Sequence, residues 1–407
     1  MNKNLRVVQI SILLILFMAT SSSAVEFRLG GTDLNVGGSA RLDTGWEYNN
    51  KGDVADGEPG SNSKMFVTIP SDTNINIKAK NGNLLGYAEL GLSNPHLNIY
   101  NSSDSNPQDK GAVRLRYAYG QDAFNNNNEM LIGQSDCMFS QLTPKQYLYD
   151  DNGMQGFGVA MSDRYPQLRY TYKQNRITAQ VAIQQPVTPV PSDFKDLSSD
   201  YEANVVIPAI VGSLTYKITN DISIIPNLYF QYYKLKADDT AQIVTEDIDV
   251  TTFGLCLNAQ AKINMLNLTG GVWWGINLGI FGNDKRFNLS SDSPVFGAPV
   301  GNNYAESGIS TNIKNNQSYG GWFQATAPVG PGLLAGGIGG QRAQTGVTEH
   351  GYMENIYTWG LFANYAYKLI QNFTIAPEIV FMNNGYDVDR RNLGNTTLVG
   401  VHFQYDF

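Results

Sequence analysis

The sequence has few charged residues, few histidines and very little cysteine. Asp, Glu, Lys and Arg make up 16% of its 407 residues, against about 25% in an ordinary soluble domain. Two cysteines, Cys137 and Cys256, are too few for a disulfide framework. The three histidines, His96, His350 and His402, are far apart in the chain. We therefore predict no metal site, no cofactor and no catalytic residues, and the chain is not expected to be an enzyme.

Long hydrophobic runs are also missing, apart from one at the N-terminus. Residues 10–19 form this apolar run, two basic residues precede it, and the small residues Ser22, Ser23 and Ala24 follow it. This order is typical of a secretory signal peptide, and the run is too short for a membrane anchor. We expect residues 1–24 to be removed during export and residues 25–407 to form a single domain.

The overall charge and composition exclude two further classes of protein. The net charge is -8 and the isoelectric point about 5.0, so nucleic acid is not an expected partner. Aromatic residues make up 11% of the chain, which a disordered acidic sequence would not contain.

What the sequence does contain is a hydrophobic period of two. In residues 34–48, LNVGGSARLDTGWEY, every second side chain is apolar or small and the others are polar or glycine. The same alternation recurs in 222–233, 251–262, 268–280 and 373–383. This period indicates β-strands with one apolar face, and the first of them is longer than a usual strand of a soluble sandwich.

The connections between these strands alternate between short and long, which is typical of an outer-membrane β-barrel with short periplasmic turns and long outer loops. The sixth strand changes parity near residues 163–166, so it contains either a bulge or a break. The last strand alternates and ends on Phe407, like the assembly signal of such barrels. The pattern predicts an all-β fold of sixteen antiparallel transmembrane strands, at about residues 34–48, 65–80, 84–92, 113–121, 129–134, 155–173, 177–186, 205–217, 222–233, 250–262, 267–280, 317–327, 333–343, 355–368, 373–383 and 396–407.

Three segments resemble a known family. Residues 113–120 read VRLRYAYG, residues 131–135 read LIGQS and residues 167–170 read QLRY. This order is similar to the trimeric porins of Gram-negative bacteria, and among them to the DcaP-like group. The resemblance implies an outer-membrane homotrimer of water-filled channels for small hydrophilic solutes, with a third loop, here 135–154, folded into the lumen. The chain lacks the N-terminal coiled coil of some members, so trimer contacts are expected on the barrel wall, where the small residues Gly38, Ala40, Gly86 and Ala88 face outward.

A passive channel has two rival interpretations. A barrel that serves as the sleeve of an outer-membrane electron-transfer conduit stays open as an alternative, because its haem-binding motifs would be in a partner chain. A channel for hydrophobic substrates would need an N-terminal plug, and only residues 25–33 precede the first predicted strand.

The candidate pore-lining residues are charged. Five basic side chains have inward parity in the first six strands: Arg41, Lys78, Arg114, Arg116 and Arg169. The third loop contributes Asp136, Lys145, Asp150 and Asp151 to the predicted constriction. A basic wall that faces an acidic loop would produce a transverse field and a weak preference for anions, which the resemblance extends to small carboxylates. The alternative is a solvated face whose charges are balanced by inward acidic residues, namely Asp43, Glu47 and Glu89.

The predicted fold places the two cysteines too far apart for a disulfide, with one exception. Cys137 begins the third loop, and Cys256 lies five strands away on the inner face of the tenth predicted strand. At about 4.8 Å per strand, their Cα atoms would exceed the reach of a disulfide, about 7 Å, unless the third loop crosses the lumen.

Overall fold

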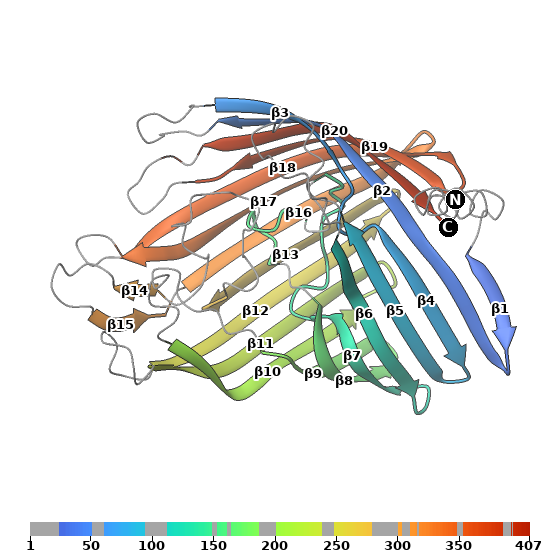
Figure 1. Cartoon of the computed structure of the whole chain (residues 1–407), viewed down its shortest axis with the longest axis horizontal. Coiled ribbons are helices and arrows are strands. Elements are labelled where there is room, and N and C mark those ends of the chain that lie inside the picture. The colour runs from blue at the N-terminus through green and yellow to red at the C-terminus, as the bar shows by residue number, and fades with distance from the viewer. Residues whose placement is uncertain are drawn as a thin grey trace, which may run out of the picture.

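The protein is an all-β closed barrel of sixteen antiparallel wall strands (Figure 1). The computed structural model describes residues 24–50, 61–93, 112–148, 153–160, 164–186, 201–237, 248–278, 300–302, 310–315, 317–347, 353–385, 392 and 394–407. Nearly all of the predicted signal peptide, residues 1–23, lies outside this set. No helix among the described residues is long and apolar enough to cross a membrane.

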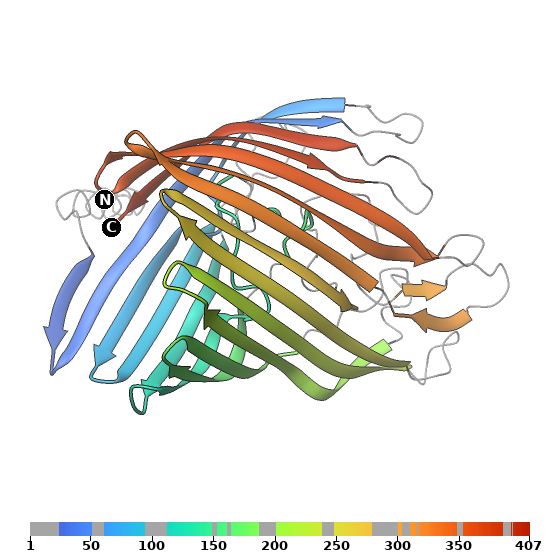
Figure 2. The same cartoon turned by 180° about the vertical axis from the view of Figure 1, so that it is seen from behind.

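The strands follow one another around the barrel in chain order. The strands of the wall are β2 (Thr32–Asn50), β3 (Ser61–Thr68), β4 (Asn74–Asn81), β5 (Leu84–Ser93), β6 (Ala112–Ala123), β7 (Asn128–Asp136), β8 (Arg164–Gln174), β9 (Ile177–Gln184), β10 (Tyr201–Lys217), β11 (Ile222–Ala237), β12 (Ile248–Ile263), β13 (Leu266–Ile276), β16 (Gln317–Val329), β17 (Gly332–Val347), β18 (Met353–Ile370), β19 (Phe373–Asn383) and β20 (Asn395–Asp406). β3 and β4 together fill one of the sixteen positions, since both pair with β2. Each position pairs with the next, and β2 pairs with β20 to close the ring (Figure 2). A short hairpin, β14 (Val300–Asn302) with β15 (Ser310–Lys314), lies in a long connection.

The alternating residues face the two sides of the wall as the period of two predicts. On β2, Trp46 is 52% exposed on the outer face, whereas Asp43 is fully buried on the inner face. The outer face is apolar because it would contact lipid, and the inner face carries mainly Ser, Thr, Asn and Gln. Sixteen strands with a polar inner face are wide enough to enclose water.

Three strands differ from the sequence prediction. The second predicted strand, 65–80, is two strands, since β3 and β4 pair in turn with β2 and are separated by residues 69–73. Ser71, Asp72 and Thr73 in this interruption are buried and polar, so the period of two does not reveal it. The sixth predicted strand, 155–173, is broken, and only β8 joins the wall.

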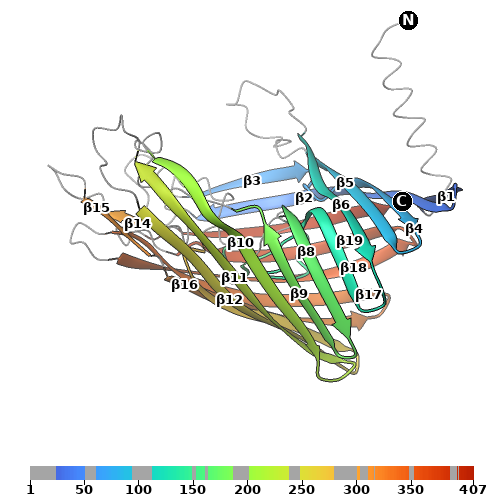
Figure 3. The same cartoon turned by 90° about the horizontal axis from the view of Figure 1, so that it is seen from below.

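The third departure is at the start of the chain. Residues before the first predicted strand form β1 (Val25–Leu29), which pairs with the beginning of β2. Val25, Phe27 and Leu29 are all exposed on β1. In Figure 3 the β1–β2 hairpin extends beyond the end of the barrel at which the short turns gather.

Candidate functional site in the barrel lumen

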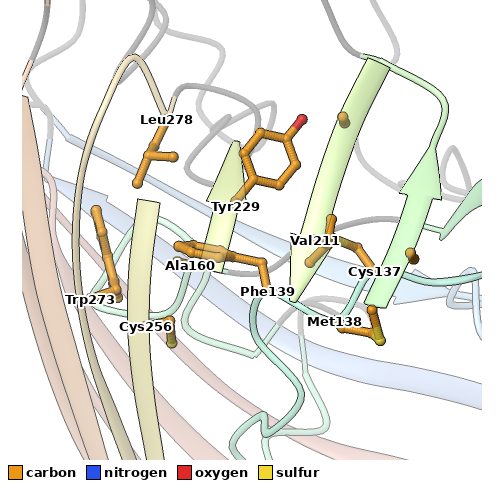
Figure 4. Packing of buried hydrophobic residues seen from close by; sticks show 11 residues of the cluster. Cys137, Met138, Phe139, Ala160, Val211, Tyr229, Cys256, Trp273 and Leu278 are labelled. Carbon is orange, nitrogen blue, oxygen red and sulfur yellow. The ribbon is translucent and has the colours of Figure 1, made fainter. Parts of the chain in front are cut away.

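The third loop, residues 137–160 as far as it is described, runs through the inside of the barrel between β7 and β8 (Figure 1). Its side chains pack in two apolar clusters on the inner wall. The first joins Cys137, Met138 and Phe139 of the loop to β9–β13, and Figure 4 shows Phe139 close to Tyr229. The loop begins after β7, and its first residues are therefore packed against strands farther around the barrel, β9 to β13.

The second cluster anchors the other half of the loop. Leu148, Met154, Phe157 and Val159 pack with apolar side chains of β16 to β20. Phe157 and Val159 are fully buried. The inner wall is thus apolar beneath the loop, although the alternation in the sequence predicts a hydrophilic inner face.

Hydrogen bonds hold the loop backbone to polar side chains of the wall. The backbone N–H groups of Tyr147 and Leu148 donate to the carboxylate of Glu378 on β19, which also accepts from Asn364 Nδ2 at 2.8 Å. Lys145 N donates to Gln324 Oε1 on β16. Backbone groups buried in the lumen need such partners, so Glu378 is an anchor of the loop that the sequence reasoning missed.

A stacked pair lies beside this anchor. The rings of Tyr147 and His402 have centroids 4.9 Å apart and an interplanar angle of 28°. His402 Nδ1 and Asp43 Oδ1 are 2.6 Å apart, and both side chains are 1% exposed. Burial raises the pKa of Tyr147. His402 is far from the other histidines in the sequence, but the fold brings it into contact with β2 and the third loop.

The two cysteines lie in one cluster because the loop crosses the lumen. Cys137 and Cys256 both belong to the cluster around Phe139 and Tyr229 (Figure 4). Both are buried, and neither forms a disulfide. The third loop thus brings Cys137 into the same cluster as Cys256, which is the exception that the count of strands allowed.

The predicted basic residues of the first strands differ in their surroundings. Arg41 forms an ion pair with Asp72 of the interruption between β3 and β4. Arg116 Nε lies 2.6 Å from Glu89 Oε1, and its other guanidinium nitrogen donates to Ser71 O at 2.8 Å. Two other basic residues of the predicted set are exposed, Lys78 and Arg114. Carboxylates therefore neutralise part of the positive charge of this wall. The sequence suggested Glu89 for this role, but not Asp72.

The predicted acidic loop residues are only partly described. Asp136 lies at the end of β7, where Arg164 Nε is 3.4 Å from Asp136 Oδ1. Lys145 is exposed on the loop. Asp150 and Asp151 lie outside the described residues, so a basic wall facing these two carboxylates stays a prediction.

Asp136 and the predicted Arg169 line one luminal pocket of about 410 Å³. Tyr117, Arg164 and Gln180 also line it, together with polar residues from the start of the third loop. Arg164 was missed because it lies where the sixth predicted strand changes parity, so the period of two does not show whether its side chain faces the lumen or the lipid. Among the described residues, no group of three His, Cys, Asp or Glu could hold a metal ion.

The closed sixteen-stranded barrel with a third loop packed inside it defines the porin fold. No protein-family model and no curated protein sequence matches the chain. Among solved structures, it is similar to the outer membrane channel DcaP of Acinetobacter baumannii, with a TM-score of 0.63 and 17% identity over 94% of this chain and 99% of that one.

Two other solved porins match at lower similarity. The anion-selective porin from Comamonas acidovorans has a TM-score of 0.57 and 12% identity, covering 92% of this chain and 100% of the other. OmpF of Salmonella typhi, solved with daunomycin, has a TM-score of 0.54 and 11% identity, covering 94% and 100%. The fold expected from the resemblance at residues 113–173 is confirmed.

Proposed function

We propose that the mature chain is an outer-membrane channel through which small hydrophilic solutes diffuse passively. The observation that carries this proposal is the anchoring of the third loop to the inner wall of a closed barrel, because a loop held there narrows the lumen. The signal peptide predicted at residues 1–24 supports export to the outer membrane. An electron-transfer sleeve is less well supported, since the third loop occupies space that a partner would need.

The proposed channel prefers small anions, though weakly. Lys78 and Arg114 are exposed inside the barrel, whereas Arg41 and Arg116 are paired with carboxylates. A paired arginine contributes little net field, and an unpaired one draws anions into the pore. The excess of positive charge on this wall is therefore small, which supports a modest selectivity.

The selectivity is tested by the reversal potential in a KCl gradient. Wild-type protein should reverse on the anion side, and the Arg114→Ala, Arg116→Ala double variant should move toward cation selectivity. Both substitutions should contribute, because Arg114→Ala removes an exposed positive charge and Arg116→Ala leaves the carboxylate of Glu89 without its partner. Glu89→Gln is the matched control in the opposite direction and should strengthen anion selectivity. A cation-selective wild type, or a double variant with an unchanged potential, contradicts the basic-wall assignment.

We also propose a homotrimer that assembles through the outer face of the first strands. This face has small residues on β2 and β5, among them Ala40 and Ala88. Small side chains protrude little, so that two walls can approach closely. The supporting measurement is mass photometry of the folded protein in mild detergent. We expect trimers for the wild type and a shift to monomers for Ala40→Arg with Ala88→Arg. Monomers as the only wild-type species would contradict the trimer.

A further inference from the structure

The pocket around Arg169 contains fixed charges of both signs. Arg164 and Arg169 provide two guanidinium groups, and Asp136 provides one carboxylate. Tyr117, Ser140 and Gln180 add hydroxyl and amide groups around them. The volume of about 410 Å³ is in the range of small-molecule sites. A solute that fills this pocket therefore meets donors and acceptors that are charged and fixed in place.

The positions of Asp136 and Arg164 are set by neighbouring side chains. The hydroxyl of Tyr117 donates to both carboxylate oxygens of Asp136, at 2.8 and 2.9 Å. The guanidinium of Arg164 lies 4.8 Å from the centroid of the Tyr117 ring and approaches Asp136 at 3.4 Å. These contacts hold the acidic and the basic group side by side before any solute arrives.

Both signs of charge retain binding capacity. The side chain of Asp136 is still 60% exposed, and a carboxylate has lone pairs for about four hydrogen bonds. Arg169 Nε is buried and has no hydrogen-bond partner within the part of the chain that the structure describes. A buried donor without a partner is unfavourable, and the guanidinium of Arg169, which lines the pocket, has further N–H groups to donate to an oxyanion. Asp136 is correspondingly set to receive a cation.

We propose that this pocket binds α-amino acids, and acidic amino acids most tightly, as a saturable site on the wall of the channel. The α-carboxylate binds Arg169, and the α-ammonium binds Asp136. The pocket has two positive groups and one negative group, so a ligand with two carboxylates and one ammonium matches its charges. A dicarboxylate without an ammonium leaves Asp136 facing a like charge, which disfavours it. This inference rests on the proposed channel function, which gives solutes access to the lumen.

The test compares L-glutamate with glutarate, which has the same carbon chain and both carboxylates but no ammonium. Isothermal titration calorimetry on the folded full-length mature protein in detergent should show tighter binding of glutamate by about tenfold. Asp136→Asn should abolish this difference, and Arg169→Gln should weaken both ligands by about tenfold. Arg176→Gln removes the same charge from the turn of the same hairpin, outside the pocket, and should leave both affinities unchanged.

The possible outcomes separate the site from the channel. Equal or tighter binding of glutarate by the wild type overturns the proposal, and so does an unchanged preference in Asp136→Asn. Each variant must first show the heat-dependent gel mobility of a folded barrel. Calorimetry does not need an open pore, so binding without single-channel conductance would contradict the channel function and leave the site standing. Conductance without glutamate binding would overturn the site alone.

Discussion

Deleting residues 141–150 of the third loop is expected to raise the single-channel conductance several-fold. The described part of this segment is held in the lumen by bonds from Lys145, Tyr147 and Leu148 to wall strands β16 and β19. Removing it takes protein volume out of the predicted constriction, and ionic current rises with the open cross-section. The measurement is single-channel conductance in planar bilayers at fixed KCl concentration.

A control of equal length separates a local effect from a general effect of shortening a loop. Residues 188–197 belong to the next long connection, which the sequence assigns to an outer loop. Deleting them should leave conductance close to the wild-type value. An unchanged conductance after deletion of 141–150, with the barrel folded, would show that the third loop does not form the constriction.

The wall of the barrel could be predicted from the sequence because each strand shows its two faces within its own residues. A strand with lipid on one side and water on the other has a strict period of two, and residues 34–48 and 373–383 display it directly. The order of the wall strands and the closure between β2 and β20 follow from repeating this pattern. The interruption at residues 69–73 was missed because Ser71, Asp72 and Thr73 are polar residues that only the fold buries.

The interior of the barrel was harder to predict because its contacts are not local. In the sequence, Glu378 is one more polar residue with inward parity on β19. Only the fold shows that it accepts hydrogen bonds from the backbone of Tyr147 and Leu148. Arg41 and Arg116 have inward parity in the sequence, but the carboxylate of Asp72 that pairs with Arg41 comes from a strand break. Inward parity identifies the residues that face the lumen, and it does not identify their partners.

The seam that closes the barrel depends on two facing glycines. Gly45 of β2 is paired with Gly400 of β20. A β-carbon at Gly45 would lie 2.4 Å from the carbonyl oxygen of Val399 and 2.6 Å from the Cα atom of Gly400. A β-carbon at Gly400 would lie 3.2 Å from Leu148 Cδ1 of the third loop. Backbone atoms cannot move aside as a flexible side chain does, so a larger residue must force the two strands apart.

Gly45→Val is therefore expected to destabilise the closed barrel by at least about 3 kcal/mol, the upper range for overpacking a well-packed site. The measurements are the heat-dependent mobility on SDS gels and the midpoint of unfolding in urea. Gly120→Val is the matched control, because a β-carbon at Gly120 would meet no atom within 4 Å. Valine also favours strands, so this control should fold with a midpoint near the wild-type value. If Gly45→Val folds as stably as Gly120→Val, close approach at the seam is not what requires glycine there.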